Sequence, residues 1–592
     1  MSNAVRSITS QESARAFEQT GGQVEARAAR KPSPGTPQTL ADGLVEALYE
    51  NGIDTYFGVP GGAIEPLFNA LARAQEQGRA TVVSTRSESG AGFAADGYYR
   101  ATGRVAVCTA TTGPGITNML TAITNAHADR IPMLVITPQV AQNKQGRGAL
   151  QDSSSDGYDM VRVLDTCCVY STQITHKDQL AHKLLIALSR ARRAPRGPVH
   201  LSIPSDLLAG GLSTETPRGA LSQRPPSICA GVPSAALDEL WTALGEARRP
   251  LFYVGDDAGP EAQRLFDVAN YFSGSVITSP AGKRWVSHDS ARYAGVLGFS
   301  GHASALAAMR DADLVIAFGA TFDELSTNTW AALPTAKTFI IDAHDTFAYR
   351  VPHGQPIVIE PREACAYLVD KLPERAQVRN SHMRVRPSAS QLVGSATGPV
   401  HPTDLMRFLS EVLPSHVVTH VDTGNSFSWS TRDMVRPNVD TYRVAMGLST
   451  MGWAIGATLG AALATRERTL GIAGDGAMLM SSLELSVAVQ EKLPVTYLVL
   501  NDFGLGMVKH GQRLAGAPSI AHEIGDVRFD LIAKACGAAG FRVESMEDLL
   551  RVPRRYLSAS DHGPCIIDVV IDREAVPPMM DRVVGLKTGI PK

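Results

Sequence analysis

Short apolar runs rich in β-branched residues alternate with longer amphipathic stretches along most of this 592-residue chain. Such runs predict buried strands, and the stretches between them are long enough for helices. Because a helix between two strands returns the chain to the same end of the sheet, the alternation indicates parallel sheets. We therefore predict an α/β fold of doubly wound domains with helices on both faces of each sheet. The predicted strands lie at residues 81–85, 105–111, 133–137, 199–203, 251–254, 275–278, 314–318, 338–341, 356–359, 417–421, 469–473, 495–500 and 565–571.

Two stretches interrupt this alternation and predict linkers between domains. Residues 211–233 are rich in Pro, Ser and Gly, and residues 374–400 are polar with little periodicity. Three domains of similar size are expected on either side of them, each long enough for one doubly wound sheet. The predicted domains are 39–210, 234–373 and 401–572, with a disordered polar tail at 1–38 and an irregular tail at 573–592.

Composition excludes several classes of protein. Lys and Arg total 56 and Asp and Glu total 58, and a formal charge of −2 does not suit a nucleic-acid-binding surface. No uncharged apolar run is long enough for a membrane span, and the N-terminus lacks a secretory leader. The seven cysteines are scattered without a CxxC spacing, which is typical of a reducing compartment. We expect a cytoplasmic protein that binds neither nucleic acid nor membranes.

The strongest chemical signal is Gly474-Asp475-Gly476, which directly follows the predicted strand at 469–473. A helical stretch at 481–491 comes next, and Asp502 follows the strand after it. Both carboxylates therefore end parallel strands, at the edge where open α/β sheets bind ligands. Two hard oxygen ligands suit Mg²⁺ that also holds a diphosphate, and the glycines let phosphate approach the backbone. The alternative is two unrelated turns.

This arrangement resembles the fingerprint of thiamin diphosphate (ThDP) enzymes. The resemblance covers nearly the whole chain after residue 38 and is strongest with the acetolactate synthase and pyruvate oxidase branch. It implies pyrimidine-binding, central and diphosphate-binding domains, in that order. The similar stretches are Phe57–Ala63 (FGVPGGA), Thr81–Arg100 around Glu88, Thr112–Asn118 (TGPGITN), Pro132–Val140, Gly447–Gly452 (GLSTMG) and Gly506–Lys509 (GMVK).

The resemblance implies ThDP and Mg²⁺ as cofactors and assigns roles to individual residues. Glu88 would hydrogen-bond the aminopyrimidine ring, although a glutamate stabilised by a helix dipole is the alternative interpretation. Met451 would hold the cofactor in a bent shape, and Gln151 would be catalytic. The metal would be held by Asp475, Asp502 and Gly504. The further cofactor contacts would be Pro60, Gly61, Gly424, Gly474, Gly476, Ala477 and Met507, and the substrate pocket would include Gly62, Gln139, Leu150, Leu325 and Gly511.

Two departures from acetolactate synthases concern the acceptor substrate. Enzymes with 2-oxo acid acceptors carry an arginine after Phe-Asp-Asp, and this arginine can pair with the acceptor carboxylate. Here Leu325 takes that place and cannot bind a carboxylate. Gly511 replaces a large aromatic residue and should open the pocket. We therefore expect a bulkier or uncharged carbonyl acceptor. The alternative is a true acetolactate synthase with its carboxylate anchor elsewhere.

FAD is a further possible cofactor. Residues 295–302 (GVLGFSGH) resemble the flavin-contacting stretch of FAD-holding members, but FAD-free members keep related central domains. The altered Phe322–Leu325 motif (FDEL) leaves both readings open.

The leading interpretation is a carboligase that decarboxylates a 2-oxo acid, pyruvate in the first instance, and adds the acyl unit to an acceptor carbonyl. An oxidase or a simple decarboxylase on the same scaffold is the second, and the absence of an adjacent His pair disfavours a decarboxylase. An inactive paralogue and a nicotinamide dehydrogenase fit less well. The resemblance implies a homodimer or homotetramer with active sites between subunits.

Overall fold

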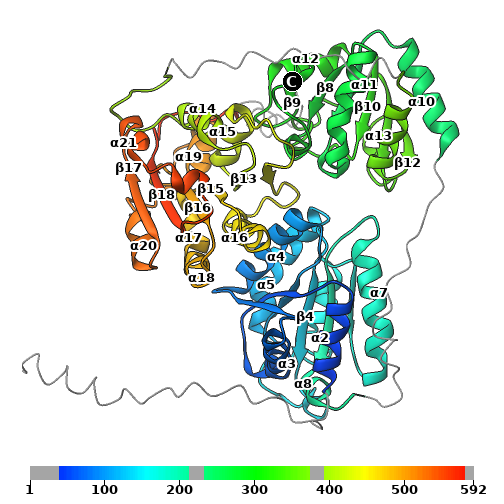
Figure 1. Ribbon diagram of the computed structural model, residues 1–592, viewed down its shortest axis with the longest axis vertical. Helices are drawn as coiled ribbons and strands as arrows, with labels where there is room; N and C mark the ends of the chain where they lie inside the picture. Colours follow the sequence, from blue (N-terminus) through cyan, green and yellow to red (C-terminus); the bar gives the residue numbers. More distant parts are fainter. Residues whose placement is uncertain (1–38, 213–232, 374–391, 580–592) are drawn as a thin grey trace, which may run out of the picture.

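The computed structural model describes residues 39–212, 233–373 and 392–579, which form three α/β domains (Figure 1). Each domain is built on a six-stranded parallel sheet, so the predicted fold class is confirmed. The predicted tail at 1–38, most of both predicted linkers and residues 580–592 lie outside the described residues. Among the helices that are described, none is long and apolar enough to cross a lipid bilayer.

The N-terminal domain, blue to cyan in Figure 1, has the strand order β2-β1-β3-β4-β6-β5. Its order reverses between β1 and β3, so the ligand crevice of this sheet is expected at their carboxyl ends. The strands are β1 Thr55–Gly58, β2 Thr81–Ser84, β3 Val107–Thr109, β4 Leu134–Gln139, β5 Tyr170–Gln173 and β6 Val199–Pro204. The helices are α2 Leu40–Glu50, α3 Glu65–Glu76, α4 Glu88–Thr102, α5 Pro114–Ala128, α6 Met160–Asp165, α7 Leu180–Arg192 and α8 Ser205–Ala209.

The central domain, green in Figure 1, has the order β12-β11-β10-β7-β8-β9 and reverses between β7 and β10. The strands are β7 Pro250–Val254, β8 Ser275–Thr278, β9 Tyr293–Val296, β10 Leu314–Phe318, β11 Lys337–Asp342 and β12 Gly354–Val358. The helices are α10 Ser234–Glu246, α11 Leu265–Tyr271, α12 Ala303–Asp311 and α13 Pro361–Asp370.

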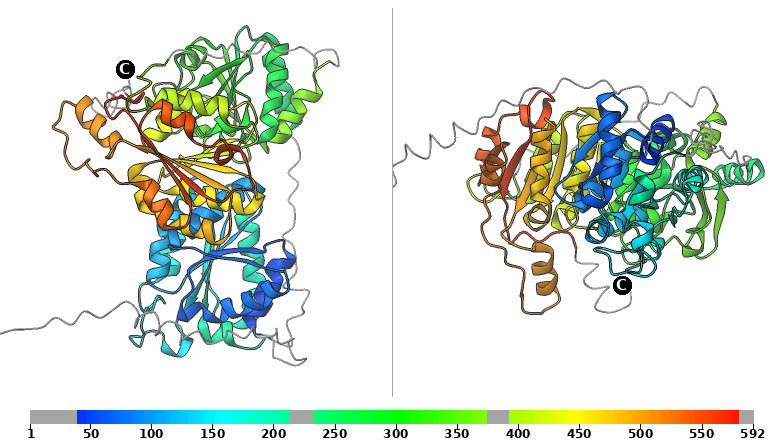
Figure 2. Two further views of the ribbon diagram at one scale, coloured as in Figure 1. Left: turned by 60° about the vertical axis from the view of Figure 1, so that its left-hand side comes forward. Right: turned by 90° about the horizontal axis from the view of Figure 1, so that it is seen from below.

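The C-terminal domain, yellow to red, has the order β14-β13-β15-β16-β18-β17 and reverses between β13 and β15 (Figure 2). The strands are β13 Val418–Val421, β14 Tyr442–Val444, β15 Thr469–Gly474, β16 Val495–Asn501, β17 Ala539–Val543 and β18 Cys565–Val570. The helices are α14 Pro402–Val412, α15 Asn425–Asp433, α16 Trp453–Thr465, α17 Asp475–Ser481, α18 Leu485–Gln490, α19 Gly506–Leu514, α20 Phe529–Ala535, α21 Met546–Arg551 and α22 Arg555–Ser558.

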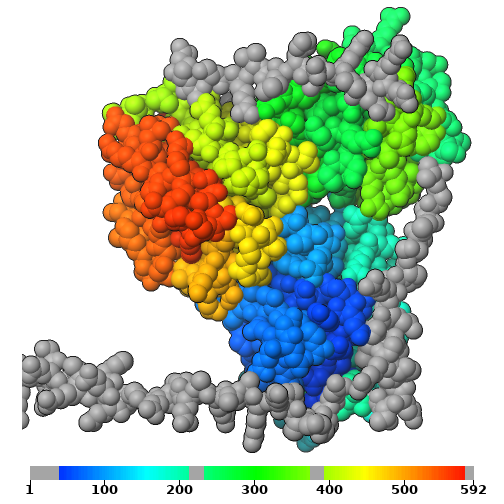
Figure 3. Space-filling model, in the orientation of Figure 1, coloured from blue at the N-terminus to red at the C-terminus, as the bar shows by residue number. Residues whose placement is uncertain are grey.

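Helices α4 and α16 join the N- and C-terminal domains in one shared hydrophobic core, where the two domains meet in Figure 3. A Cβ atom on Gly97 of α4 would clash with the carbonyl oxygen of Ala457, and one on Gly460 of α16 would clash with that of Ala94. Glycine is therefore required for the two backbones to approach this closely. The small residues 90–95, which the sequence suggested as an apolar setting for Glu88, belong to this helix contact.

Every predicted strand is present, with ends that shift by at most a few residues. Five strands were not predicted: β1, β5, β9, β14 and β17. The last four are edge strands of their sheets, which are only partly buried or very short and so lack a long apolar run. The helical stretch predicted at 481–491 begins earlier, because α17 starts at Asp475 itself and a 3₁₀ turn at Ser482–Glu484 precedes α18.

Candidate functional site

Two acidic side chains lie at the carboxyl ends of the neighbouring strands β15 and β16 in the C-terminal domain. Asp475 is 2% exposed and Asp502 is 8% exposed. Asp475 Oδ1 accepts a hydrogen bond from the Gly476 amide (2.7 Å), and Oδ2 accepts one from the Gly504 amide (2.8 Å). Burial and the neighbouring charge of Asp502 raise the pKa of Asp475 to about 7, and burial raises the pKa of Asp502 to about 6. Two buried carboxylates that repel each other fit a divalent cation, which neutralises both.

Two helices begin beside these carboxylates without a side-chain cap. The first residue of α15 is Asn425, and the first of α19 is Gly506; neither helix has a capping hydrogen bond from a side chain. A Cβ atom on Gly506 would clash with the Asp502 carboxylate and lie 2.5 Å from Asn425 Nδ2, so the three residues meet. Gly424, which precedes α15, has a φ of +94°, which favours glycine. Free amide groups at both helix ends fit the diphosphate of the predicted cofactor.

Met451 reaches the same edge of the sheet. An added Cβ on Gly476 would lie 3.2 Å from Met451 Cε. The loop around Met451 is held by Asp422, whose carboxylate accepts hydrogen bonds from the amides of Gly452 (3.1 Å) and Ala454 (2.8 Å). Asp422 is fully buried, and burial raises its pKa to about 7. Sequence reasoning missed Asp422, although its place at the end of a predicted strand was a usable signal.

The predicted residues of the N-terminal domain lie at the carboxyl edge of the neighbouring strands β2, β1, β3 and β4. Glu88 is the first residue of α4; it is half-buried and accepts a hydrogen bond from Asn118 Nδ2 (3.2 Å). Pro60, Gly61 and Gly62 follow β1, and Gln139 ends β4. The topology therefore gathers these residues at one edge of one sheet.

Gln139 and Gln151 lie in one hydrogen-bonded group of loops. Gln139 Oε1 accepts hydrogen bonds from the amides of Val140 (2.9 Å) and Ser153 (3.1 Å). The Thr112 hydroxyl donates to the carbonyl of Gln151 (3.0 Å). Leu150, the residue before Gln151, is 86% exposed, so in the single chain it contacts solvent.

Glu484, which the sequence analysis did not single out, connects the two predicted site regions. Its carboxylate accepts hydrogen bonds from the amides of Arg86 (3.2 Å) and Ser87 (2.9 Å), directly before Glu88. Glu484 follows Asp475 by nine residues of α17 and the 3₁₀ turn, which at 1.5 Å per residue separates them by on the order of 10 Å. Within one chain, Glu88 therefore lies near the far end of this segment and away from Asp475.

Leu325 and Gly511 lie on opposite sides of a cavity of about 260 Å³ between the central and C-terminal domains. The Leu325 carbonyl accepts a hydrogen bond from the Phe299 amide (2.7 Å), and Phe299 lines the cavity. An added Cβ on Gly511 would lie 3.8 Å from Cε of Met579, which lines it from the other side. Both predicted substrate-pocket residues thus touch its walls.

The switch point of the central sheet is closed by protein. A Cβ on Gly255, after β7, would clash with the carbonyl of Gly319, after β10. The next residues, Asp256 and Asp257, carry carboxylates, and Asp257 accepts a hydrogen bond from Arg130 Nε of the N-terminal domain (2.6 Å). An open α/β sheet binds a dinucleotide here through a glycine-rich loop. Two carboxylates and an inserted guanidinium do not fit the anionic diphosphate of FAD.

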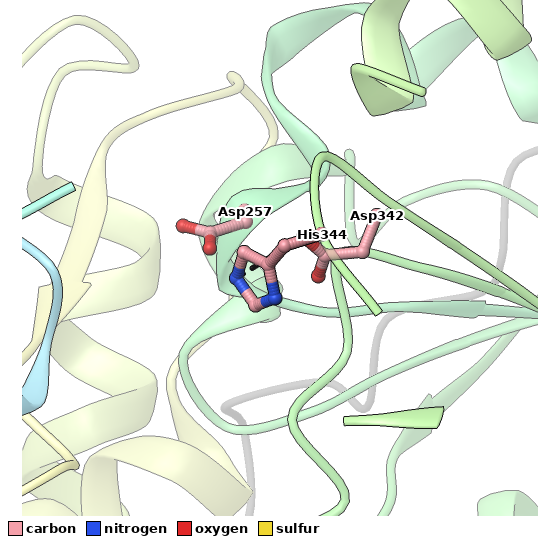
Figure 4. Close-up of side chains that lie close together, drawn as sticks. All are labelled: Asp257, Asp342 and His344. Atoms are coloured by element: carbon pink, nitrogen blue, oxygen red, sulfur yellow. Dashed lines mark ion pairs between the residues drawn. The ribbon is translucent and has the colours of Figure 1, made fainter. Parts of the chain in front are cut away.

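Asp257, Asp342 and His344 form a cluster at this edge (Figure 4). Their ligand atoms lie within 4.8 Å of one another, and His344 Nε2 lies 3.5 Å from Asp342 Oδ1. The adjoining cavity, of about 20 Å³, is also lined by Arg130 and Arg196. Because guanidinium groups already supply the positive charge, we interpret the cluster as an ionic contact between the N-terminal and central domains.

Comparisons with known proteins agree with this geometry. Three descriptions of thiamine pyrophosphate enzymes match: the N-terminal TPP binding domain at residues 38–160, the central domain at 237–368 and the C-terminal TPP binding domain at 422–569. The acetolactate synthase large subunit of Parasynechococcus marenigrum is 30% identical over 91% of this chain and 88% of its own. The isozyme 2 large subunit of acetolactate synthase from Escherichia coli is 29% identical over 90% and 95%.

A solved structure has the same fold. The thiamine diphosphate-dependent 4-hydroxybenzoylformate decarboxylase of Rhodococcus jostii superposes with a TM-score of 0.81 at 20% identity. The match covers 91% of this chain and all of that one, so it includes all three domains.

Proposed function

Because the chain belongs to the ThDP-dependent enzymes, in their acetolactate synthase-like group, we propose that it is a Mg²⁺-dependent carboligase. It decarboxylates a 2-oxo acid, pyruvate in the first instance, and transfers the acyl unit to an acceptor carbonyl. The observation that carries the proposal is the buried pair Asp475 and Asp502, whose raised pKa values leave a place for a cation.

Each part of the site has a task in this proposal. Asp475, Asp502 and the carbonyl of Gly504 hold Mg²⁺, and the free amides of α15 and α19 bind the diphosphate. ThDP, when bound, supplies the chemistry by which a 2-oxo acid loses CO₂ and its acyl unit passes to a second carbonyl. Met451 orients the cofactor, with its loop held by Asp422. Glu88 exchanges a proton with the pyrimidine ring.

The active site is proposed to form between two copies of the chain. Glu88 and Asp475 belong to different domains, and the contact of Glu484 with the start of α4 separates them within one chain. Apolar side chains beside Asp475 are also exposed: Met480 is 65% exposed and Leu483 is 64% exposed. A second copy that covers this face would bring its own Glu88 edge to the metal site.

The acceptor is proposed to differ from a standard 2-oxo acid. Leu325 packs its side chain against the core of the C-terminal domain and offers no charge to a carboxylate. Gly511 leaves the space beside Met579 without a side chain of its own. Both features support an acceptor larger than pyruvate.

The test is a screen of the purified protein with ThDP, Mg²⁺ and pyruvate, alone and with a panel of aldehydes and ketones. Mass spectrometry of the products is expected to detect a new carbon–carbon bond to a bulky acceptor and little 2-acetolactate. Rapid formation of 2-acetolactate from pyruvate alone would instead identify a true acetolactate synthase. Free acetaldehyde or acetate as the main product would identify a decarboxylase or an oxidase.

We also propose that the enzyme works without FAD. Asp256 and Asp257 occupy the switch point of the central sheet, where a dinucleotide would need donors for its phosphates. The protein purified with added FAD is expected to show no flavin absorption near 450 nm and to release no flavin on heating. A stoichiometric flavin band would contradict this part of the proposal.

A further inference from the structure

The cavity between the central and C-terminal domains, called the junction cavity here, has a mixed lining. It is bounded by residues 297–303 after β9, by α12, by the end of α15 and by residues 578 and 579. Leu297, Phe299, Leu306 and Met579 give it apolar walls. A volume of about 260 Å³ accommodates one aromatic ring with its substituents, near the lower limit of ordinary ligand pockets.

Arg432 provides the permanent charge of the lining. None of the lining residues, all of which are described, is Asp, Glu or Lys, and Arg432 itself is exposed. His302 is held neutral by its hydrogen bonds. Its Nδ1 accepts from the Val296 amide (3.0 Å), so its Nε2 carries the proton and donates to the Arg432 carbonyl (3.0 Å). An anionic group of a ligand would therefore bind at Arg432.

Helix α15 connects this charge to the metal site. Asn425, its first residue, meets Asp502 through Gly506, whereas Arg432 is seven residues later, about 10 Å along the helix at 1.5 Å per residue. Phe427 lies between them and stacks on Phe299 of the cavity wall, with ring centroids 6.0 Å apart. A ligand bound at Arg432 must therefore extend several ångströms before it reaches the cofactor.

We propose that the junction cavity is the acceptor site, and that the acceptor is a carbonyl compound with an apolar or aromatic body and a carboxylate remote from the carbonyl. Arg432 binds that carboxylate, and so replaces an arginine at the position of Leu325 with a charge farther from the reacting atoms. This inference rests on the proposed carboligase function. It explains together the missing charge at Leu325, the absent side chain at Gly511 and the charge at Arg432.

The test compares two aldehydes of the same body, 4-carboxybenzaldehyde and benzaldehyde, as acceptors for pyruvate with the holoenzyme. A charge-assisted hydrogen bond is expected to give the carboxylate compound a KM lower by about tenfold. Arg432→Met is expected to remove this preference while leaving the kcat with benzaldehyde within about twofold. Arg310→Met, which changes another exposed arginine at a helix end, serves as the control and is expected to keep the preference.

Equal KM values for the two aldehydes in the wild type would overturn the proposal, and so would an unchanged preference in Arg432→Met. Release of CO₂ from pyruvate without any acceptor tests the donor half separately. If no CO₂ appears, the proposed donor is wrong, and calorimetric binding of 4-(hydroxymethyl)benzoate, an unreactive analogue, still tests the cavity. Binding that Arg432→Met abolishes supports the site, and absent or unchanged binding refutes it.

Discussion

Asp475→Ala is expected to lose Mg²⁺ and ThDP binding together. Asp475 is nearly fully buried beside Asp502, so the substitution removes one of the two carboxylates proposed to hold the ion. Because the metal bridges the protein and the diphosphate, we expect the affinity for ThDP at saturating Mg²⁺ to fall by at least ~100-fold. Isothermal titration calorimetry of the metal-free protein with ThDP and Mg²⁺ measures this directly. Wild-type affinity in the variant would refute the assignment of Asp475 as a ligand.

The same variant is expected to leave the metal-free fold intact. The pKa of Asp475 is raised to about 7 in the fold, from 3.8. A carboxyl of this kind stabilises the fold fully only below pH 3.8, and that contribution is lost as the pH rises through about 7. Near neutral pH the negative charge therefore does not support the empty site. Thermal unfolding with and without ThDP separates the two effects, since a ligand at 100 times its Kd stabilises by about 2.7 kcal/mol. We expect this shift in the wild type and in the control Asp526→Ala, and not in Asp475→Ala.

The carboxyl-edge residues were predictable because parallel strands bring their carboxyl ends to one edge. Asp475 and Asp502 each follow a long apolar run, so their meeting required only that β15 and β16 be neighbours. The same logic applied to Asp422, which follows β13, but no spacing motif marked it. Its role depends on amides 30 and 32 residues later, and that contact exists only because the loop to α16 returns over the sheet.

Contacts between domains were beyond sequence patterns. Glu484 binds amides 398 and 397 residues away, and nothing in its own neighbourhood predicts that partner. The glycines of α4 suggested an apolar setting for Glu88, whereas their lack of side chains serves the approach of α16. The acidic pair Asp256 and Asp257 likewise became informative only when the structure placed it at the switch point beside Arg130. Local patterns encode strands and turns, while these features depend on how finished domains pack.

Glu88→Gln is expected to keep ThDP and to lose most turnover. Glutamine preserves the shape and can still accept the hydrogen bond of Asn118, but it cannot exchange a proton. Loss of a proton-transfer group lowers kcat by about 10²–10⁴-fold, and ThDP affinity should change little. Glu65→Gln is the matched control, because Glu65 also begins a helix at the same sheet edge and loses the same interaction with the helix dipole. We expect the control to stay within about twofold of the wild type. Full activity of Glu88→Gln would refute the proposed role.

Mixing the two inactive variants tests where the active site lies. If Glu88 of one chain serves the metal site of its partner, a dimer of Glu88→Gln with Asp475→Ala contains one site in which both residues are native. Half of the randomly assembled dimers are mixed and each has one such site out of two, so about a quarter of wild-type activity should return. A site formed within one chain cannot be repaired by mixing, because each chain would still lack one of the two residues. Co-refolded or co-expressed variants with distinct affinity tags, purified over both tags, make the comparison direct. No recovery in the purified mixed dimer would show that the proposed shared site is wrong, while Asp475→Ala alone would still report on the metal.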